Sequence, residues 1–357
     1  MYKIINGTKV ITVDANEPET EKVREAAKYI REGDVVAFPT ETVYGLGADA
    51  LSPDAVKKIF IAKGRPQDNP LIVHIAIKDE IERIANGITS DVEALMERFW
   101  PGPLTLILEK KDLIPNEITA GLNTVGIRMP SHPVAQKLIL ESGVPIAAPS
   151  ANISGRPSPT TALHVIKDLA GKIPIILDGG PTEVGLESTV LDMTSESPVI
   201  LRPGGVTYEQ LCSVLKRVEI DSGLLSDGFV PKSPGMKYTH YSPKAEVILV
   251  IGSTEKVKET VRRIAGKETN LGRRVGIMAT SETMNAYSIG DILDIGSRED
   301  PSTIAANLFS ALREFDNRGV DLIIAEGIEE KGIGLAVMNR IKKASGFNII
   351  YADEHSK

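Results

Sequence analysis

The sequence contains little cysteine, few aromatic residues and no long apolar run. Its single cysteine, Cys212, excludes a disulfide scaffold and a thiolate zinc site. No segment approaches the roughly 18 consecutive apolar residues that cross a bilayer, and the first residues lack the basic start and apolar stretch of a signal peptide. We therefore expect a reduced, cytoplasmic protein with no role for a membrane.

Positive charge is also scarce for a protein that would bind nucleic acid. The chain has 41 Lys and Arg against 48 Asp and Glu, a net charge of −7, and aromatic residues make up only 4% of it. Nucleic-acid-binding proteins usually present a basic surface and aromatic rings on which bases stack. Any anionic ligand should therefore be small and held by a few placed cations.

Standard catalytic signatures are missing as well. There is neither a phosphate-binding loop ending in Gly-Lys-Ser/Thr nor a Gly-x-Ser-x-Gly elbow. Gly45-Leu-Gly47 lacks the third glycine and the acidic partner of a dinucleotide site. The function has to be sought in less common patterns.

A length of 357 residues predicts two domains. Residues 1–216 alternate irregularly between helical and strand patterns, which favours a twisted, mixed α/β sheet. Residues 217–244 are rich in proline and read as an extended linker. Residues 245–357 alternate strand and helix regularly, so they should form a smaller, parallel three-layer domain.

Five polar segments of the first domain invite a functional interpretation. Each also has an ordinary explanation, such as a strand end, a helix end that favours cations, or a surface loop. Together, however, they place five cations near predicted strand edges, which would suit a polyphosphate. The segments span residues 38–47, 63–70, 124–130, 147–158 and 186–190 with 201–205, and the cations are Lys63, Arg65, Arg128, Arg156 and Arg202.

Two of these residues keep alternative interpretations. Arg128 ends an apolar strand, and a buried arginine needs a partner, which is either a protein carboxylate or a substrate carboxylate. His74 lies in a predicted strand, where a histidine is more often a core residue than a functional one.

The motifs themselves resemble those of the YrdC-type threonylcarbamoyl-AMP synthases. The matching segments are Pro39-Thr-Glu-Thr-Val-Tyr-Gly-Leu-Gly47, Lys63-Gly-Arg65-Pro, Pro149-Ser-Ala-Asn152, Glu187-Ser-Thr189 and Leu201-Arg-Pro-Gly204. The linker segment Ser233-Pro-Gly-Met-Lys-Tyr-Thr-His-Tyr-Ser-Pro243 and residues 334–345 resemble the long, two-domain form, so nearly the whole chain is covered.

The resemblance implies a YrdC-like catalytic domain followed by a Rossmann-like domain. It implies an enzyme that makes threonylcarbamoyl-adenylate from L-threonine, bicarbonate or CO2, and ATP with Mg2+, releasing pyrophosphate. The product would serve the N6-threonylcarbamoyl modification of adenosine 37 in tRNAs that read ANN codons. A downstream tRNA transferase would be a partner, with direct tRNA binding weak or absent.

The resemblance also assigns residues. Lys63, Arg65, Ser150 and Asn152 would be catalytic; the ATP site would comprise these four with Asn69, Thr124, Ser158, Arg202 and Tyr241. Threonine would contact Thr40 or Thr42, His74, Arg128, the backbone at Ala148, and Ser188. No protein side chain is expected to be a dedicated metal ligand, and no general base is assigned, although His74 is a candidate. Apart from the resemblance, we expect Tyr238, His240 and Tyr241 of the linker to cover the cavity, the alternative being that the linker is a passive tether.

Three alternatives remain open at this point. The same domain could form a carbamoyl-adenylate from carbamoyl phosphate, as in hydrogenase-maturation proteins, but those chains are much longer and carry zinc-finger cysteines. It could be a non-enzymatic RNA-binding module, against which the charge and the scarcity of aromatic residues argue. The role of the second domain cannot be assigned from fold analogy alone.

Overall fold

The computed structural model describes residues 2–221, 223 and 241–353. The chain divides into two compact units, one comprising Met1–Ser154 with Ser158–Tyr238 and the other Gly155–Pro157 with Thr239–Lys357. Most of the predicted linker, residues 217–244, lies outside the described residues, so the predicted domain boundaries stay predictions. No helix of the described part is long and apolar enough to cross a bilayer.

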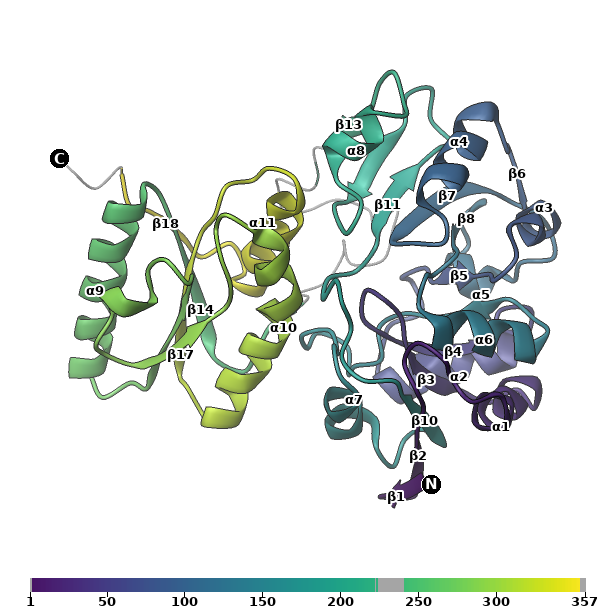
Figure 1. Cartoon of the computed structure of the whole chain (residues 1–357), viewed down its shortest axis with the longest axis horizontal. Coiled ribbons are helices and arrows are strands. Elements are labelled where there is room, and N and C mark those ends of the chain that lie inside the picture. Colours follow the sequence, from purple (N-terminus) through teal and green to yellow (C-terminus); the bar gives the residue numbers. More distant parts are fainter. Residues whose placement is uncertain (1, 222, 224–240, 354–357) are drawn as a thin grey trace. The chain divides into compact units, whose positions relative to one another are not determined.

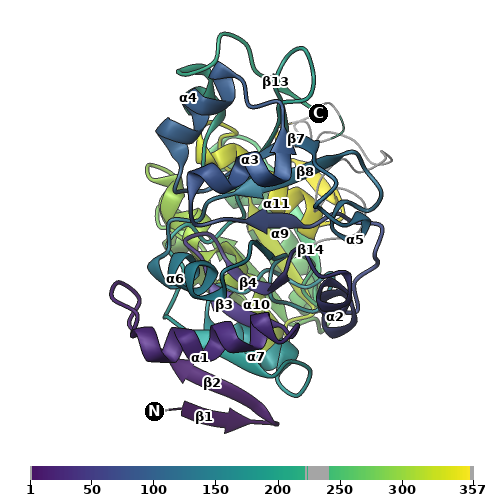
Figure 2. The same cartoon turned by 90° about the vertical axis from the view of Figure 1, so that its right-hand side faces the viewer.

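The first unit is built on one mixed sheet, as the irregular alternation predicted (Figure 1). The described strands lie in the order β1 (Tyr2–Ile5), β2 (Thr8–Thr12), β10 (Ile175–Asp178), β3 (Val36–Pro39), β4 (Tyr44–Asp49), β9 (Ile146–Ala147), β5 (Ile72–His74), β8 (Thr124–Arg128), β7 (Leu104–Lys110), β11 (Thr189–Asp192), β12 (Val199–Arg202) and β13 (Glu219–Ile220), and β6 (Ala85–Asn86) pairs with β7. The β1–β2 hairpin, which the sequence patterns did not predict, forms one end of this sheet (Figure 2).

Around strand β3 both faces of this sheet are apolar, and the alternation of its side chains shows why. Its successive side chains point to opposite faces, so Ala37 enters one hydrophobic cluster while Val36 and Phe38 enter another. All four residues of β3 are therefore buried. A strand covered on both faces reads as an unbroken apolar run.

Helices cover these faces and begin where local signals predict. Ser52 caps α2 through its side chain, which accepts a hydrogen bond from the Ala55 amide, and Pro53 takes the first helical position. The described α-helices of this unit are α1 (Thr20–Arg31), α2 (Pro53–Lys63), α3 (Ile81–Ile84), α4 (Ser90–Phe99), α5 (Asn116–Thr119), α6 (Pro133–Ser142), α7 (Ala162–Leu169) and α8 (Tyr208–Cys212), with the 3-10 helix η1 (Lys78–Glu80).

The second unit has the parallel three-layer architecture that its pattern predicted. Its five-stranded sheet has the order β16 (Asp291–Asp294), β15 (Val275–Ala279), β17 (Leu322–Glu326), β14 (Glu246–Ile251) and β18 (Ile349–Tyr351), and the strands that pair are parallel. Helix α9 (Thr254–Asn270) lies on one face, and α10 (Pro301–Arg318) and α11 (Ile333–Ala344) lie on the other (Figure 1). The 3-10 helix η3 (Met284–Ala286) follows β15.

Candidate active site

Three adjacent strands place polar side chains in one row. His74 of β5 is paired with Arg128 of β8, which is paired on its other side with Thr105 of β7. Residues directly opposite each other in a sheet project from the same face. His74, Arg128 and Thr105 therefore lie side by side, all buried.

Arg128 is held by the segment that follows β3. Its Nη2 lies 2.6 Å from Oε1 of Glu41, and its Nη1 donates to the Thr42 hydroxyl at 2.9 Å. Its Nε donates to the carbonyl of Gly102 at 3.3 Å. The partner that a buried arginine requires is thus a protein carboxylate in this structure.

The two threonines of this segment support each other. The hydroxyls of Thr40 and Thr42 are 2.8 Å apart, and that of Thr40 also donates to the carbonyl of Val43 at 2.7 Å. Both side chains are buried. They fix the turn that presents Glu41 and Thr42 to Arg128.

His74 is uncharged at neutral pH. Its ring Nδ1 lies 3.2 Å from the carbonyl of Ile72. Burial, followed by the positive charge of Arg128, lowers the pKa of His74 to about 3. A group with this pKa is a poor proton acceptor near pH 7, so the structure gives no support to His74 as a general base.

Lys63 joins the end of α2 to the loop after β9. Its ammonium donates to the carbonyls of Ser150 and Asn152, the latter at 2.6 Å, and lies 3.4 Å from Oδ1 of Asn152. The Ser150 hydroxyl donates to the same Oδ1 at 2.5 Å. The structure therefore brings together the Lys-x-Arg and Ser-x-Asn motifs, which are 87 residues apart in the chain.

The loop after α2 carries two further predicted residues. Gly64 ends the helix in the left-handed conformation, with φ of 60°. Arg65 then donates through Nη2 to the carbonyls of Asn69 and Pro70, both at 3.3 Å. Asn69 is 1% exposed, and its Oδ1 has no hydrogen-bond partner among the described residues. Such a buried polar atom is available to a ligand.

Ser188 and Arg202 meet beside Thr105. The Ser188 hydroxyl is 2.8 Å from that of Thr105 and accepts a hydrogen bond from Nη2 of Arg202 at 3.1 Å. Arg202 also donates through Nε to the carbonyl of Ser188 at 3.0 Å. Nearby in the chain, Glu187 accepts a hydrogen bond from the hydroxyl of Ser158 at 2.5 Å.

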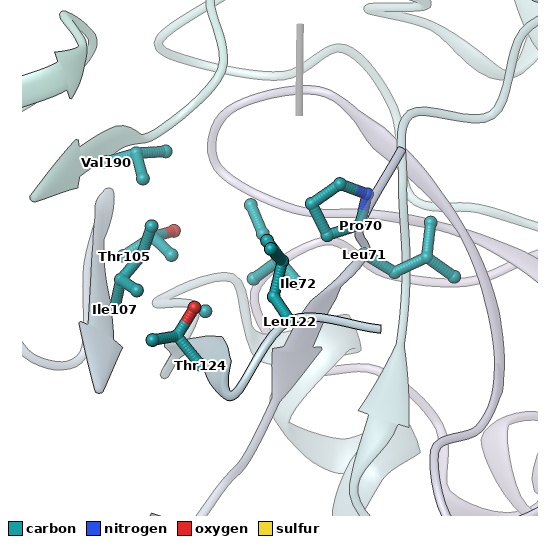
Figure 3. A pocket seen from close by; sticks show the side chains of 9 residues that line it. Pro70, Leu71, Ile72, Thr105, Ile107, Leu122, Thr124 and Val190 are labelled. Atoms are coloured by element: carbon teal, nitrogen blue, oxygen red, sulfur yellow. The ribbon is translucent and has the colours of Figure 1, made fainter. Parts of the chain in front are cut away.

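A pocket opens between the strands of this sheet (Figure 3). Thr124, the first residue of β8, lines it together with Thr105, and the remaining lining is mostly apolar. The expected contact of Thr124 with a nucleotide stays a prediction. Ala148 lies at the next strand edge, where its amide donates to the carbonyl of Ile72 at 2.9 Å.

Tyr241 belongs to the second unit. Its backbone is left-handed, with φ of 66°, and its ring is 5% exposed. The ring stacks on Phe309 with centroids 5.2 Å apart, and the guanidinium of Arg340 lies 5.5 Å from its centroid. Its expected contact with a nucleotide stays a prediction, and Tyr238 and His240 lie outside the described residues.

Sequence reasoning missed Glu41, Glu187 and Thr105 as site residues. Both glutamates stand inside motifs that carried the resemblance, and a carboxylate next to hydroxyl-bearing residues was the available signal. Thr105 gave none, because it lies in an ordinary strand pattern and only the pairing of β7 with β8 reveals it.

Two family models match the chain. The model described as "Telomere recombination", which covers the Sua5, YciO and YrdC proteins, matches residues 28–204. The model described as "Threonylcarbamoyl-AMP synthase, C-terminal domain" matches residues 206–346.

Similar proteins span nearly the full length. The threonylcarbamoyl-AMP synthase of Pyrococcus abyssi is 52% identical, covering 92% of this chain and 95% of the relative. The threonylcarbamoyl-AMP synthase of Bacillus subtilis is 51% identical, and the match covers 95% of this chain and 96% of that relative. The crystal structure of Pyrococcus abyssi Sua5 in complex with L-threonine has a TM-score of 0.92 at 51% identity and covers 96% of this chain and 99% of that one. The chain therefore belongs to the two-domain threonylcarbamoyl-AMP synthase family.

Proposed function

We propose that this enzyme forms L-threonylcarbamoyl-adenylate from L-threonine, bicarbonate or CO2, and ATP, with release of pyrophosphate. The observation that carries the proposal is the row His74, Arg128 and Thr105, continued by Ser188 and Arg202, in a family with a threonine-bound relative. This row offers cations and hydroxyls on one face of a sheet, which suits an amino acid next to a phosphate group.

The reaction needs positioning more than covalent help. The amine of threonine adds to CO2 and gives a carbamate, one oxygen of which attacks the α-phosphorus of ATP while pyrophosphate leaves. Holding the reactants in line and neutralising the phosphate charge account for most of such an acceleration. For this positioning and charge neutralisation, the protein has to supply cations in fixed places.

The chain's residues divide between the two substrates. Lys63, Arg65 and Arg202 would hold the phosphates, and threonine would lie against Arg128, Thr40 or Thr42, His74, Ser188 and the backbone at Ala148. The nucleotide site would be completed by Asn69, Thr124, Ser150, Asn152, Ser158 and Tyr241. Mg2+ would enter as part of the substrate MgATP, bound to phosphate oxygens.

The biological role follows from the product. The adenylate would supply the threonylcarbamoyl group to a transferase that modifies adenosine 37 of tRNAs reading ANN codons, in the cytoplasm. Because the adenylate is the only species that passes to the transferase, this enzyme would not need to bind tRNA tightly.

Pyrophosphate release tests the proposal directly. Purified protein is incubated with ATP, Mg2+, bicarbonate and L-threonine, and one component is left out at a time. We expect release that requires both threonine and bicarbonate. Release without threonine would refute the proposal, and carbamoyl phosphate would then be tried as the substrate.

A further inference from the structure

Glu41 places a negative charge beside the residue proposed to hold the carboxylate of threonine. It is 4% exposed, and its Oε1 lies 2.6 Å from Nη2 of Arg128. Its backbone carbonyl accepts a hydrogen bond from the amide of Val184 at 2.8 Å, which fixes the segment on its other side. Glu41 is thus a built part of the site and not a surface charge.

Neither oxygen of this carboxylate accepts a hydrogen bond from a described residue, and Oε1 is in contact only through its ion pair with Arg128. Oε2 of Glu41 is buried and accepts no hydrogen bond from any residue that the structure describes. The protons of the neighbouring hydroxyls are engaged elsewhere, since Thr40 donates to the carbonyl of Val43 and Thr42 therefore donates to the Thr40 hydroxyl. Buried carboxylate oxygens are normally hydrogen-bonded, because leaving one unpaired is costly. A donor supplied by a ligand would satisfy it.

Threonine brings such a donor. A free α-amino acid carries an ammonium and a carboxylate on the same carbon, so a buried site needs a partner of each sign, close together. Arg128 alone would leave the ammonium unpaired, and a buried charge without a partner weakens binding strongly. Arg128 supplies a positive charge and Glu41 a negative charge, and Nη2 of Arg128 lies 2.6 Å from Oε1 of Glu41.

We propose that Oε2 of Glu41 accepts a hydrogen bond from the ammonium group of threonine while Arg128 binds its carboxylate. This inference rests on the proposed function and names how its amino-acid site recognises the substrate. Glu41 then selects α-amino acids against 2-hydroxy acids of the same shape, which carry the carboxylate but not the ammonium. Among the buried carboxylates of this unit, Glu187 instead accepts the hydroxyl of Ser158.

The test compares two ligands on the full chain by titration calorimetry without ATP. One is L-threonine, and the other is (2S,3R)-2,3-dihydroxybutanoate, in which a hydroxyl replaces the ammonium. We expect the wild type to bind threonine at least about tenfold more tightly, as a charge-assisted hydrogen bond would give. In Glu41→Gln this ratio should fall by about tenfold, because only threonine loses a charged partner. If Glu41 merely held Arg128 in place, both ligands would weaken equally, and an unchanged ratio would overturn the proposal.

A matched control separates this effect from the loss of any buried carboxylate. Glu326→Gln neutralises a glutamate of the second unit that is 0% exposed and lies 2.8 Å from Nη2 of Arg298. It should leave the ligand ratio unchanged, and a fall of the ratio in this control would overturn the assignment to Glu41.

The wild-type comparison does not depend on the folding of a variant. Equal affinity for both ligands would overturn the role of Glu41 and leave the proposed function standing, provided that pyrophosphate release requires threonine. Failure of the wild type to release pyrophosphate with threonine would instead overturn the proposed function, and the inference with it.

Discussion

Burial separates Lys63 from the other lysines of its helix. Lys63 is 2% exposed and donates to backbone carbonyls of the Ser-x-Asn loop, whereas the Lys57 side chain of the same helix is 45% exposed and pairs with Asp54. A cation at the end of a helix is explained by the macrodipole alone. The macrodipole does not explain the direct contact of Lys63 with the Ser-x-Asn loop. This contact makes Lys63 the residue to test.

We expect Lys63→Met to lower the rate of pyrophosphate release by about 10²-fold or more. The change removes a positive charge from the proposed phosphate site and one hydrogen-bond donor from the carbonyls of Ser150 and Asn152. The measurement is the release rate at saturating ATP, threonine and bicarbonate. Lys57→Met is the control on the same helix and should remain within about twofold of the wild type, since exposed ion pairs contribute little. Wild-type activity in Lys63→Met would remove Lys63 from the catalytic residues.

His74 makes stability depend on acid pH. Its pKa is lowered to about 3 in the fold, whereas an unfolded histidine titrates near pH 6.5, so between these values only the unfolded chain takes up the proton. The free energy of unfolding should therefore fall as the pH drops from 7 to 5, by about 2 kcal/mol from this group. Urea unfolding at both pH values, in the wild type and in His74→Asn, measures it. A pH-dependent loss equally large in the variant would show that His74 does not cause it.

At the scale of residues, candidates for the site could be named from the sequence only where a motif contained them. The resemblance named Lys63, Arg128 and Ser188, and the structure places Lys63 against the Ser-x-Asn loop and Arg128 and Ser188 on either side of Thr105. No local pattern tells that Glu41 is the partner of Arg128, because the two are far apart in sequence and meet only through the fold. Long-range ion pairs of this kind need the tertiary structure.

At the scale of elements, local signals predicted helices better than strands. The apolar spacing of residues 90–99 predicts a helix, and α4 covers the same residues, while Ser52 and Pro53 mark the start of α2. Both depend on caps and periodicity within a few residues. The two-residue strand β9 was missed, because it exists only through its pairing with β4 and β5. Such strands have no periodicity of their own.

The turn after β12 shows how a glycine serves the site through packing. A Cβ on Gly204 would lie 2.3 Å from the carbonyl oxygen of Glu187 and 2.4 Å from the backbone of Ser188. Only glycine lets β12 approach this segment so closely. The turn thereby holds Ser188 next to Arg202.

We expect Gly204→Ala to destabilise the first unit by about 1–3 kcal/mol and to lower activity, because the backbone at Ser188 must shift. Gly266→Ala is the matched control. It lies within α9 of the second unit, where an added Cβ meets nothing within 4 Å, and should be neutral or stabilise by up to about 1 kcal/mol. The measurements are the thermal unfolding and the rate of pyrophosphate release of both variants, compared with the wild type. A stable, fully active Gly204→Ala would contradict the packing argument.

At the scale of the whole molecule, the two architectures were predictable from alternation alone. Regular strand–helix alternation after residue 245 predicted the parallel sheet of the second unit, and irregular alternation predicted the mixed sheet of the first. The order of the strands was not predictable, because it depends on pairings between distant segments such as β2 with β10. The row of site residues is a product of that order.

Total charge leads to a prediction about tRNA. With a net charge of −7, the chain as a whole repels a polyanion, and three of the five candidate cations, Lys63, Arg128 and Arg202, are buried. Binding of nucleic acid is dominated by contacts with phosphates and falls steeply with salt in proportion to their number. We therefore expect filter binding to detect no specific complex with an unmodified ANN-reading tRNA at about 150 mM salt, and little dependence on salt where weak binding occurs. Tight binding with a steep salt dependence would mean that a local basic surface outweighs the total charge, and that the enzyme delivers its product while holding the tRNA.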